Sequence, residues 1–507
     1  MITILSLFVS AAFQSTVQRQ IIVDPLMITM VEEIWASIGK GKVWPGWDPR
    51  STPILIYLPG KQDLLINHPK PPPGFQKYVG PIRSTLGEMF IRNGSTLLEY
   101  DGQNTSMPVN GVETLVVADT LSTRRQWIES LAPTLAERPY DSNAVISNGL
   151  YPDPYATMTL FAHEAFHVFQ SKRAKGAGAN ELALGQYPSL SVENNVGLSQ
   201  ESEILSEVIT AKEPSEVRRL ASEWLAVRLE RRKSLPASSI AYEDAVELNE
   251  GLAKYVEYRT LDAFRGRNPR YEAFLIQGFQ GYEGIDDLQK GLRQSMIGFM
   301  SGSSTVNNDL FGSSPVRFRL YYSGMGAALL LDRLGVDWKS KVLEGGKPLT
   351  AIAEEALKGA IPKPPKAPES VIVAKRKLAE EGKAHVSKEL AALDSAPGQL
   401  VIDYSKLHPT EPQFSFTPFG ILRVDDDRCF FRLIPLSGRV GTTKFREETP
   451  RPALWDRLKK QIILQLTAIP AQLPTLEKSI SFGGVTIEGA KGDLSLNGRK
   501  VVLTLTQ

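Results

Sequence analysis

The chain has a single cysteine, Cys429, and only 5 histidines among its 507 residues. One cysteine cannot form an internal disulfide, and it cannot supply the sulfur ligands of a cysteine-based zinc site. Its neighbours Phe430 and Phe431 favour a small, buried side chain at this position. Because histidine is so scarce, any closely spaced pair of histidines is informative.

The sequence also lacks an excess of charge of either sign. Lys plus Arg is 58 and Asp plus Glu is 56, which gives a formal net charge of +2. This balance offers no argument for a nucleic acid or an anionic membrane as partner. The basic run RLERRK at residues 228–233 is therefore interpreted as the solvated face of a helix.

Apolar runs long enough to cross a membrane are missing as well. The first residues, MITILSLFVSAAFQSTVQ, hold an apolar stretch of about a dozen residues followed by small side chains. This pattern predicts a signal peptide over residues 1–20, although no Lys or Arg precedes Arg19. We therefore expect a secreted or periplasmic protein without an integral membrane segment.

The length and the patterning predict an α+β protein of several domains. The first part of the chain mixes short apolar runs with helical periodicity, and the part after it has mainly helical patterns. A Pro- and Lys-rich linker with a charged helix follows, and the last part alternates apolar and polar residues as strands do. The expected parts are the N-terminal α/β part of a catalytic region over residues 21–150, a helical core over 151–360, the linker and charged helix over 361–400, and a β domain over 401–507.

The segment TLFAHEAFHVFQ carries the pattern HExxH at residues 163–167. On a helix, His163 and His167 lie on one face, so both imidazoles can reach a single metal ion about 2 Å away. Glu164 can reach a water on that metal as a general base without being a ligand. The other side chains around the motif are mostly apolar, and buried polar groups need partners. The sequence therefore predicts Zn2+ as a cofactor.

A catalytic zinc needs a third protein ligand, and no further histidine follows at a suitable spacing. We expect a carboxylate. The segment LNEGLAKYVEY favours Glu250, because Gly251 beside it allows two helices to approach closely. Glu257, two turns further on the same face, is placed to accept a hydrogen bond from a ligand imidazole. Spacing alone leaves the other carboxylates open, with Glu207 as the first alternative: Glu181, Glu193, Glu201, Glu203, Glu207, Glu243 and Glu247.

HEAFH followed by LNEGLAKYVEY resembles the gluzincin zinc metallopeptidases (HExxH…NEGxAxYxE), nearest in motif to the aminopeptidase N and glycyl aminopeptidase group. The resemblance implies a thermolysin-like zincin core, a mixed sheet plus a helical lobe, followed by a C-terminal β-rich domain. It also implies His163, His167 and Glu250 as zinc ligands and Glu164 as the base. In aminopeptidase N the third ligand follows about twenty residues after the motif. Here Glu250 follows His167 by 83 residues, so we expect a helical hairpin inserted between two helices that still meet at the metal.

The segment RLYYSGMGAALLLDRLG is similar to a helix of the same families that carries a catalytic tyrosine. The similarity implies Tyr321, with Tyr322 as the alternative, as hydrogen-bond donor to the oxyanion. The GAMEN-like strand that binds the substrate amine in aminopeptidase N has no counterpart before the motif.

These motifs together predict an exported zinc metallopeptidase that cleaves peptide bonds with zinc-activated water. Its partner would be a peptide or protein substrate and no nucleic acid. The alternatives are an aminopeptidase and a non-catalytic zinc-binding periplasmic module on a peptidase scaffold.

Overall fold

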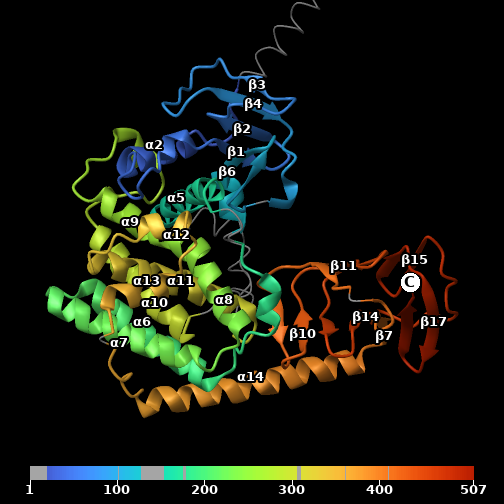
Figure 1. The fold of residues 1–507 in the computed structure, drawn as a ribbon. Helices are drawn as coiled ribbons and strands as arrows, with labels where there is room; N and C mark the ends of the chain where they lie inside the picture. Colours follow the sequence, from blue (N-terminus) through green and yellow to red (C-terminus); the bar gives the residue numbers. More distant parts are fainter. Residues whose placement is uncertain are drawn as a thin grey trace, which may run out of the picture. The chain divides into compact units, whose positions relative to one another are not determined.

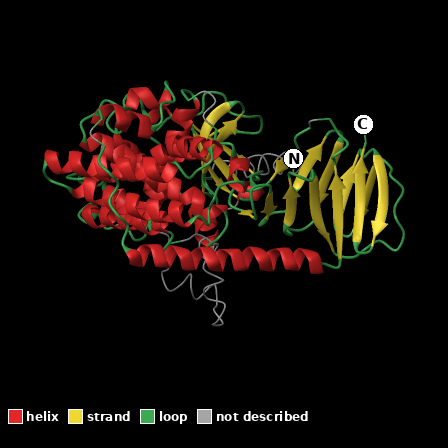
Figure 2. Cartoon of the chain, turned by 60° about the horizontal axis from the view of Figure 1, so that its bottom comes forward, coloured by secondary structure: helices red, strands yellow, loops and turns green. Residues whose placement is uncertain are grey.

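The computed structural model describes residues 20–100, 102–126, 153–174, 178–304, 310–359, 361–408 and 410–506. The expected signal peptide lies outside these ranges, apart from Gln20. None of the helices within them is both long enough and apolar enough to span a membrane. The described residues form an α+β fold with three sheets and a C-terminal region rich in strands (Figures 1 and 2).

The chain forms two compact units, each built from segments that are distant in sequence. The first comprises the residues up to Ala177 with Leu248–Arg293 and Asp337–Lys347, and the second comprises Gly178–Glu247, Gln294–Val336 and Pro348–Gln507. Both units therefore draw on the region expected to be one helical core, and the domain boundaries expected from the sequence stay a prediction.

A six-stranded sheet in the order β3-β4-β2-β1-β6-β5 belongs to the first unit. β1 pairs with β6 in parallel, and the other neighbours are antiparallel. All five residues of β1, ILIYL, are buried, as expected for a strand that is covered on both faces. The strands are β1 (Ile54–Leu58), β2 (Gln62–Ile66), β3 (Gln76–Lys77), β4 (Met89–Asn93), β5 (Thr105–Val109) and β6 (Val112–Ala118).

Helix α5 (Pro154–Ser171) packs against this sheet and against α9 (Leu252–Phe264). Its start is set by Asp153, whose side chain accepts a hydrogen bond from the Tyr155 amide. Phe166 packs against two tryptophans: its ring centroid lies 4.9 Å from that of Trp44 and 5.4 Å from that of Trp47. The unit also contains α2 (Leu26–Ile38), η1 (Pro49–Ser51), η2 (Leu98–Tyr100), η5 (Tyr271–Leu275), α12 (Lys339–Leu343) and most of α10 (Ile285–Ser301).

The helices of the second unit include the expected hairpin. α6 (Val192–Thr210) and α7 (Pro214–Arg232) pack along each other and are joined by residues 211–213. α14 (Glu369–Ser395) is one uninterrupted helix, as expected for the charged segment (Figure 2). The others are η3 (Glu181–Gly185), α8 (Ala237–Val246), α11 (Ser313–Arg333) and α13 (Leu349–Leu357). The short π-helix η4 (Glu247–Gly251) joins α8 to α9.

Two sheets of the second unit, of seven and five strands, share one apolar core. Phe445 and Ile487 of the smaller sheet and Ile462 of the larger one are buried in it. Cys429 is buried in the same core, as expected. The larger sheet has the order β17-β18-β7-β14-β13-β10-β9 and the smaller β15-β16-β12-β11-β8. The strands are β7 (Gly398–Asp403), β8 (Gln413–Ser415), β9 (Ile421–Arg423), β10 (Arg428–Phe431), β11 (Ser437–Val440), β12 (Thr443–Glu447), β13 (Ala453–Asp456), β14 (Gln461–Leu466), β15 (Ser479–Phe482), β16 (Val485–Glu488), β17 (Gly492–Asn497) and β18 (Lys500–Leu505).

The basic run at residues 228–233 is not the solvated face of a helix, and that interpretation is wrong. Arg228, Arg231 and Arg232 are buried, and each has a carboxylate oxygen within 3.1 Å. The carboxylates come from neighbouring segments that the sequence alone does not place beside this helix. We name these six side chains the charge cluster: Glu201, Arg228, Arg231, Arg232, Glu243 and Glu247.

Glu201 accepts from both Arg228 and Arg231, so its removal should be costly. In the variant Glu201→Gln two buried guanidiniums lose their shared negative charge, and we expect the free energy of unfolding to fall by about 3–5 kcal/mol. Denaturant unfolding measures this. The exposed ion pair of Glu216 with Arg219 provides the control, because Glu216→Gln should leave the midpoint unchanged. Equal midpoints for the two variants would contradict the assigned role of Glu201.

Glu447 on β12 is also buried, with its side chain in a residue that is 1% exposed. Its Oε2 accepts a hydrogen bond of 2.9 Å from the Leu436 amide, and its Oε1 has no partner among the described residues. Burial raises the pKa of Glu447 to about 7, and the Leu436 hydrogen bond and the charge of Arg451 offset this only in part.

The raised pKa of Glu447 predicts a pH dependence of stability. The folded state holds this proton more tightly than the unfolded state, so the stabilisation is complete below about pH 4.5 and is lost as the pH rises to about 7. Glu447→Gln should therefore gain about 2–3 kcal/mol relative to the parent between pH 4.5 and pH 7.5. Unfolding curves of both proteins across this range test it, and a pH-independent difference would be the contrary result.

Candidate metal centre

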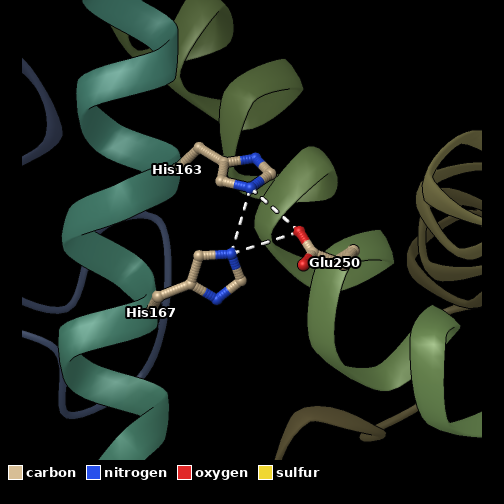
Figure 3. Close-up of side chains that lie close together, drawn as sticks. All are labelled: His163, His167 and Glu250. Atoms are coloured by element: carbon tan, nitrogen blue, oxygen red, sulfur yellow. Dashed lines mark hydrogen bonds and ion pairs between the residues drawn. The ribbon is translucent and has the colours of Figure 1, made fainter. Parts of the chain in front are cut away.

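His163, His167 and Glu250 come together in the first unit, with their ligand atoms facing one another (Figure 3). The two histidines project from α5, and Glu250 comes from the π-helix η4 that precedes α9. His163 Nε2 lies 3.1 Å from His167 Nε2. Glu250 Oε2 lies 3.4 Å from His163 Nε2 and 3.3 Å from His167 Nε2. These residues could hold a metal ion.

The three distances fit a tetrahedral ion. Ligand atoms about 2.0–2.1 Å from a tetrahedral centre lie about 3.3–3.4 Å from one another, and the observed separations are 3.1, 3.3 and 3.4 Å. Three ligand atoms leave a fourth corner to something other than these side chains. The group thus consists of two histidines and one glutamate at a spacing that suits a metal ion.

Each histidine is oriented by a second acceptor at its other ring nitrogen. His163 Nδ1 lies 2.7 Å from Glu257 Oε1, and His167 Nδ1 lies 2.7 Å from Gln170 Oε1. When each Nδ1 donates its hydrogen, the two Nε2 atoms and the Glu250 oxygen are three acceptors that face one another. Such a set needs a positive charge between its members, which a metal ion or a proton on an imidazole supplies. The expected contact of Glu257 with a ligand imidazole is thus present.

Gln170 was not found by sequence reasoning, although it follows His167 by three residues and so lies on the same helix face. Its amide nitrogen donates to the carbonyl oxygens of Leu248 and Asn249, both at 3.1 Å. These carbonyls belong to the π-helical turn that carries Glu250, where the wider turn alters the regular backbone hydrogen bonding. One buried amide therefore fixes the orientation of His167 and anchors the turn that presents Glu250.

Carboxylates set the electrostatics of this group. Burial alone would lower the pKa of His163, but Glu250, Glu257 and Glu164 outweigh it and raise that pKa to about 10. Burial would raise the pKa of Glu250, but hydrogen bonds to the two histidines hold it well below its usual range. The local field thus favours a positive charge between these side chains. Lys254 Nζ lies 2.7 Å from Glu257 Oε2 and partly neutralises the outer carboxylate.

Glu164 lies on α5 directly after His163 and is partly exposed. Burial raises its pKa, while the charges of His163 and His167 lower it.

The remaining candidates lie in the second unit. Tyr321 is packed against Phe318, with ring centroids 5.3 Å apart, and Tyr322 stacks on Phe299 at 5.0 Å. Their role as oxyanion donors stays a prediction. Glu207, the alternative third ligand, is exposed on α6. The charge cluster holds Glu201, Glu243 and Glu247, and Glu181 pairs with Arg317.

Comparison of the chain with models of protein families, with curated proteins and with solved structures finds no match in any of the three.

Replacing Glu250 by Gln should weaken metal binding. The change removes the only carboxylate among the three ligand atoms, so we expect the affinity for Zn2+ to fall at least about 100-fold, beyond the 10–100-fold typical of residues that only support a ligand. Competition with a chromogenic chelator measures it, with Glu207→Gln as control at parent affinity. If Glu207→Gln were the weakened variant, the alternative assignment would hold.

Proposed function

We propose that this protein is an exported zinc-dependent peptidase of the gluzincin type, with a thermolysin-like catalytic core. The observation that carries the proposal is the arrangement of the three ligand atoms at tetrahedral spacing. In addition, Glu164 follows the ligand residue His163 directly on α5. A structural zinc site has four protein ligands. The described residues supply three ligand atoms to this group, and in the proposal the fourth position binds water and substrate.

With zinc bound, the site supplies a Lewis acid for the peptide carbonyl and a water of lowered pKa. Glu164 takes the proton of the attacking water and returns it to the leaving amine. His163 and His167 hold their Nε2 atoms toward the centre, because Glu257 and Gln170 bind the opposite ring nitrogens.

Glu164→Gln separates catalysis from metal binding. The amide keeps the size of the side chain but cannot accept the proton, so peptide hydrolysis should fall by about 10²–10⁴-fold while the affinity for Zn2+ stays within about twofold. The assay follows new termini by mass spectrometry in a mixture of peptides with free and with acetylated amino termini. Glu207→Gln, an exposed carboxylate exchange, is the matched control and should keep parent activity.

The same assay distinguishes the alternatives. An endopeptidase cleaves both peptide sets, whereas an aminopeptidase loses activity on acetylated ones. If the parent protein bound one equivalent of zinc and cleaved neither peptide set, the result would contradict the peptidase proposal. It would favour a non-catalytic zinc-binding module. Parent-like hydrolysis by Glu164→Gln would show that the assigned base is wrong.

A further inference from the structure

Arg319 on α11 differs from the arginines of the charge cluster. It is buried, at 4% exposure, yet none of the described carboxylates lies within ion-pair distance of it. Each guanidinium of the charge cluster has such a carboxylate within 3.1 Å. A buried charge without a counter-ion costs several kcal/mol, and for that reason such groups are nearly always paired.

One side of the Arg319 guanidinium is occupied by a neutral group. Its Nη1 donates to Asn195 Oδ1 at 2.6 Å. The Asn195 amide nitrogen donates to the carbonyls of Ser189 and Ser191, both at 2.8 Å, so the oxygen is the atom that faces Arg319. The hydrogen bond therefore satisfies one donor and leaves the charge uncompensated.

The other side of the guanidinium, formed by Nε and Nη2, is the edge that binds two oxygens of one anion side-on. Nε is buried and has no acceptor among the described residues. Nη2 lies 2.9 Å from the position that a Cβ atom would take on Gly302, so only a residue without a side chain leaves room there. The unused edge of Arg319 thus borders the backbone at the end of α10.

A second cation approaches the same place. Lys375 on α14 donates to the carbonyl oxygen of Ser301, the last residue of α10. Lys375 is partly buried and has no carboxylate partner in the described part of the chain. Burial lowers the pKa of Arg319, and burial together with the nearby Arg319 lowers that of Lys375. Two like charges therefore meet beside residues 301 and 302.

The end of α10 does not neutralise them. A helix C-terminus attracts cations, but its dipole equals only about half an elementary charge. Two cations on this end leave a surplus of more than one positive charge. An unexplained buried polar group of this kind indicates a bound ion or water, and water cannot supply the missing charge.

We propose that Arg319 and Lys375 form a binding site for a small oxyanion of the phosphate or sulfate class. The anion accepts two hydrogen bonds from the Nε and Nη2 edge of Arg319 and an ion pair from Lys375. This geometry suits the planar fork of arginine and two oxygens of a tetrahedral anion. The site lies wholly in the second unit, and it is independent of the metal centre.

Phosphate titrations test this site. The melting temperature of the parent should rise saturably with inorganic phosphate at constant ionic strength, as binding to the folded state requires. Arg319→Met, which keeps an unbranched chain without the charge, should lose the phosphate-dependent rise. It should be at least as stable as the parent in phosphate-free buffer, because an unpaired buried charge is gone.

Lys375 provides a second variant and a matched control on the same helix. Lys375→Met should weaken phosphate binding at least about tenfold by calorimetry, whereas Lys377→Met, at an exposed lysine two residues away, should bind like the parent. A phosphomonoester such as glycerol phosphate is tested alongside, and binding of either compound at this site supports the proposal. If the melting temperature rose with phosphate equally and without saturation in the parent, Arg319→Met and Lys375→Met, the rise would be a general salt effect. That result would overturn the proposed anion site.

Discussion

The packing of α5 against α9 is the contact on which the candidate metal centre depends. Two ligand atoms come from α5 and the third from the π-turn before α9, and neither segment alone can complete the group. The helix positions are set by ordinary core packing, such as Phe166 between two tryptophans. A shift of α9 by a fraction of an ångström would change the ligand separations, so the polar group is only as well defined as the apolar contacts around it.

The second unit contains the charge cluster, in which buried arginines and glutamates pair with one another. Its helices bury three arginines and three glutamates in contact with one another, at 2.6–3.1 Å for the closest pairs. Such clusters contribute little net stability relative to an apolar core, but they permit few alternative arrangements, because moving one helix would leave a charge unpaired. Arg319 is also buried in these helices, but none of the described carboxylates pairs with it, and that contrast is the basis for the proposed anion site.

The sequence predicted those features that depend on local pattern. The spacing of His163 and His167 on one helix face needs only the helical repeat, and the strand of residues 54–58 needs only a short apolar run. Spacing left several carboxylates open, and Glu250 was favoured by its neighbour Gly251 and by the motif resemblance. The charge cluster was missed because Arg228 and its neighbours read as a solvated face, and nothing local shows that Glu201 and Glu243 will lie beside them. The π-turn was missed because its sequence is also compatible with a regular helix.

The 83 residues between His167 and Glu250 have a consequence for the order of events during synthesis. At about 5–20 residues per second, a ribosome takes roughly 4–17 s to add that segment. During this interval both histidines are already part of the chain while the third ligand has not yet been made. The hairpin of α6 and α7 emerges in between and belongs to the other unit. Until Glu250 has been added, the nascent chain contains only two of the three ligands, and the full set forms only after α9 has docked.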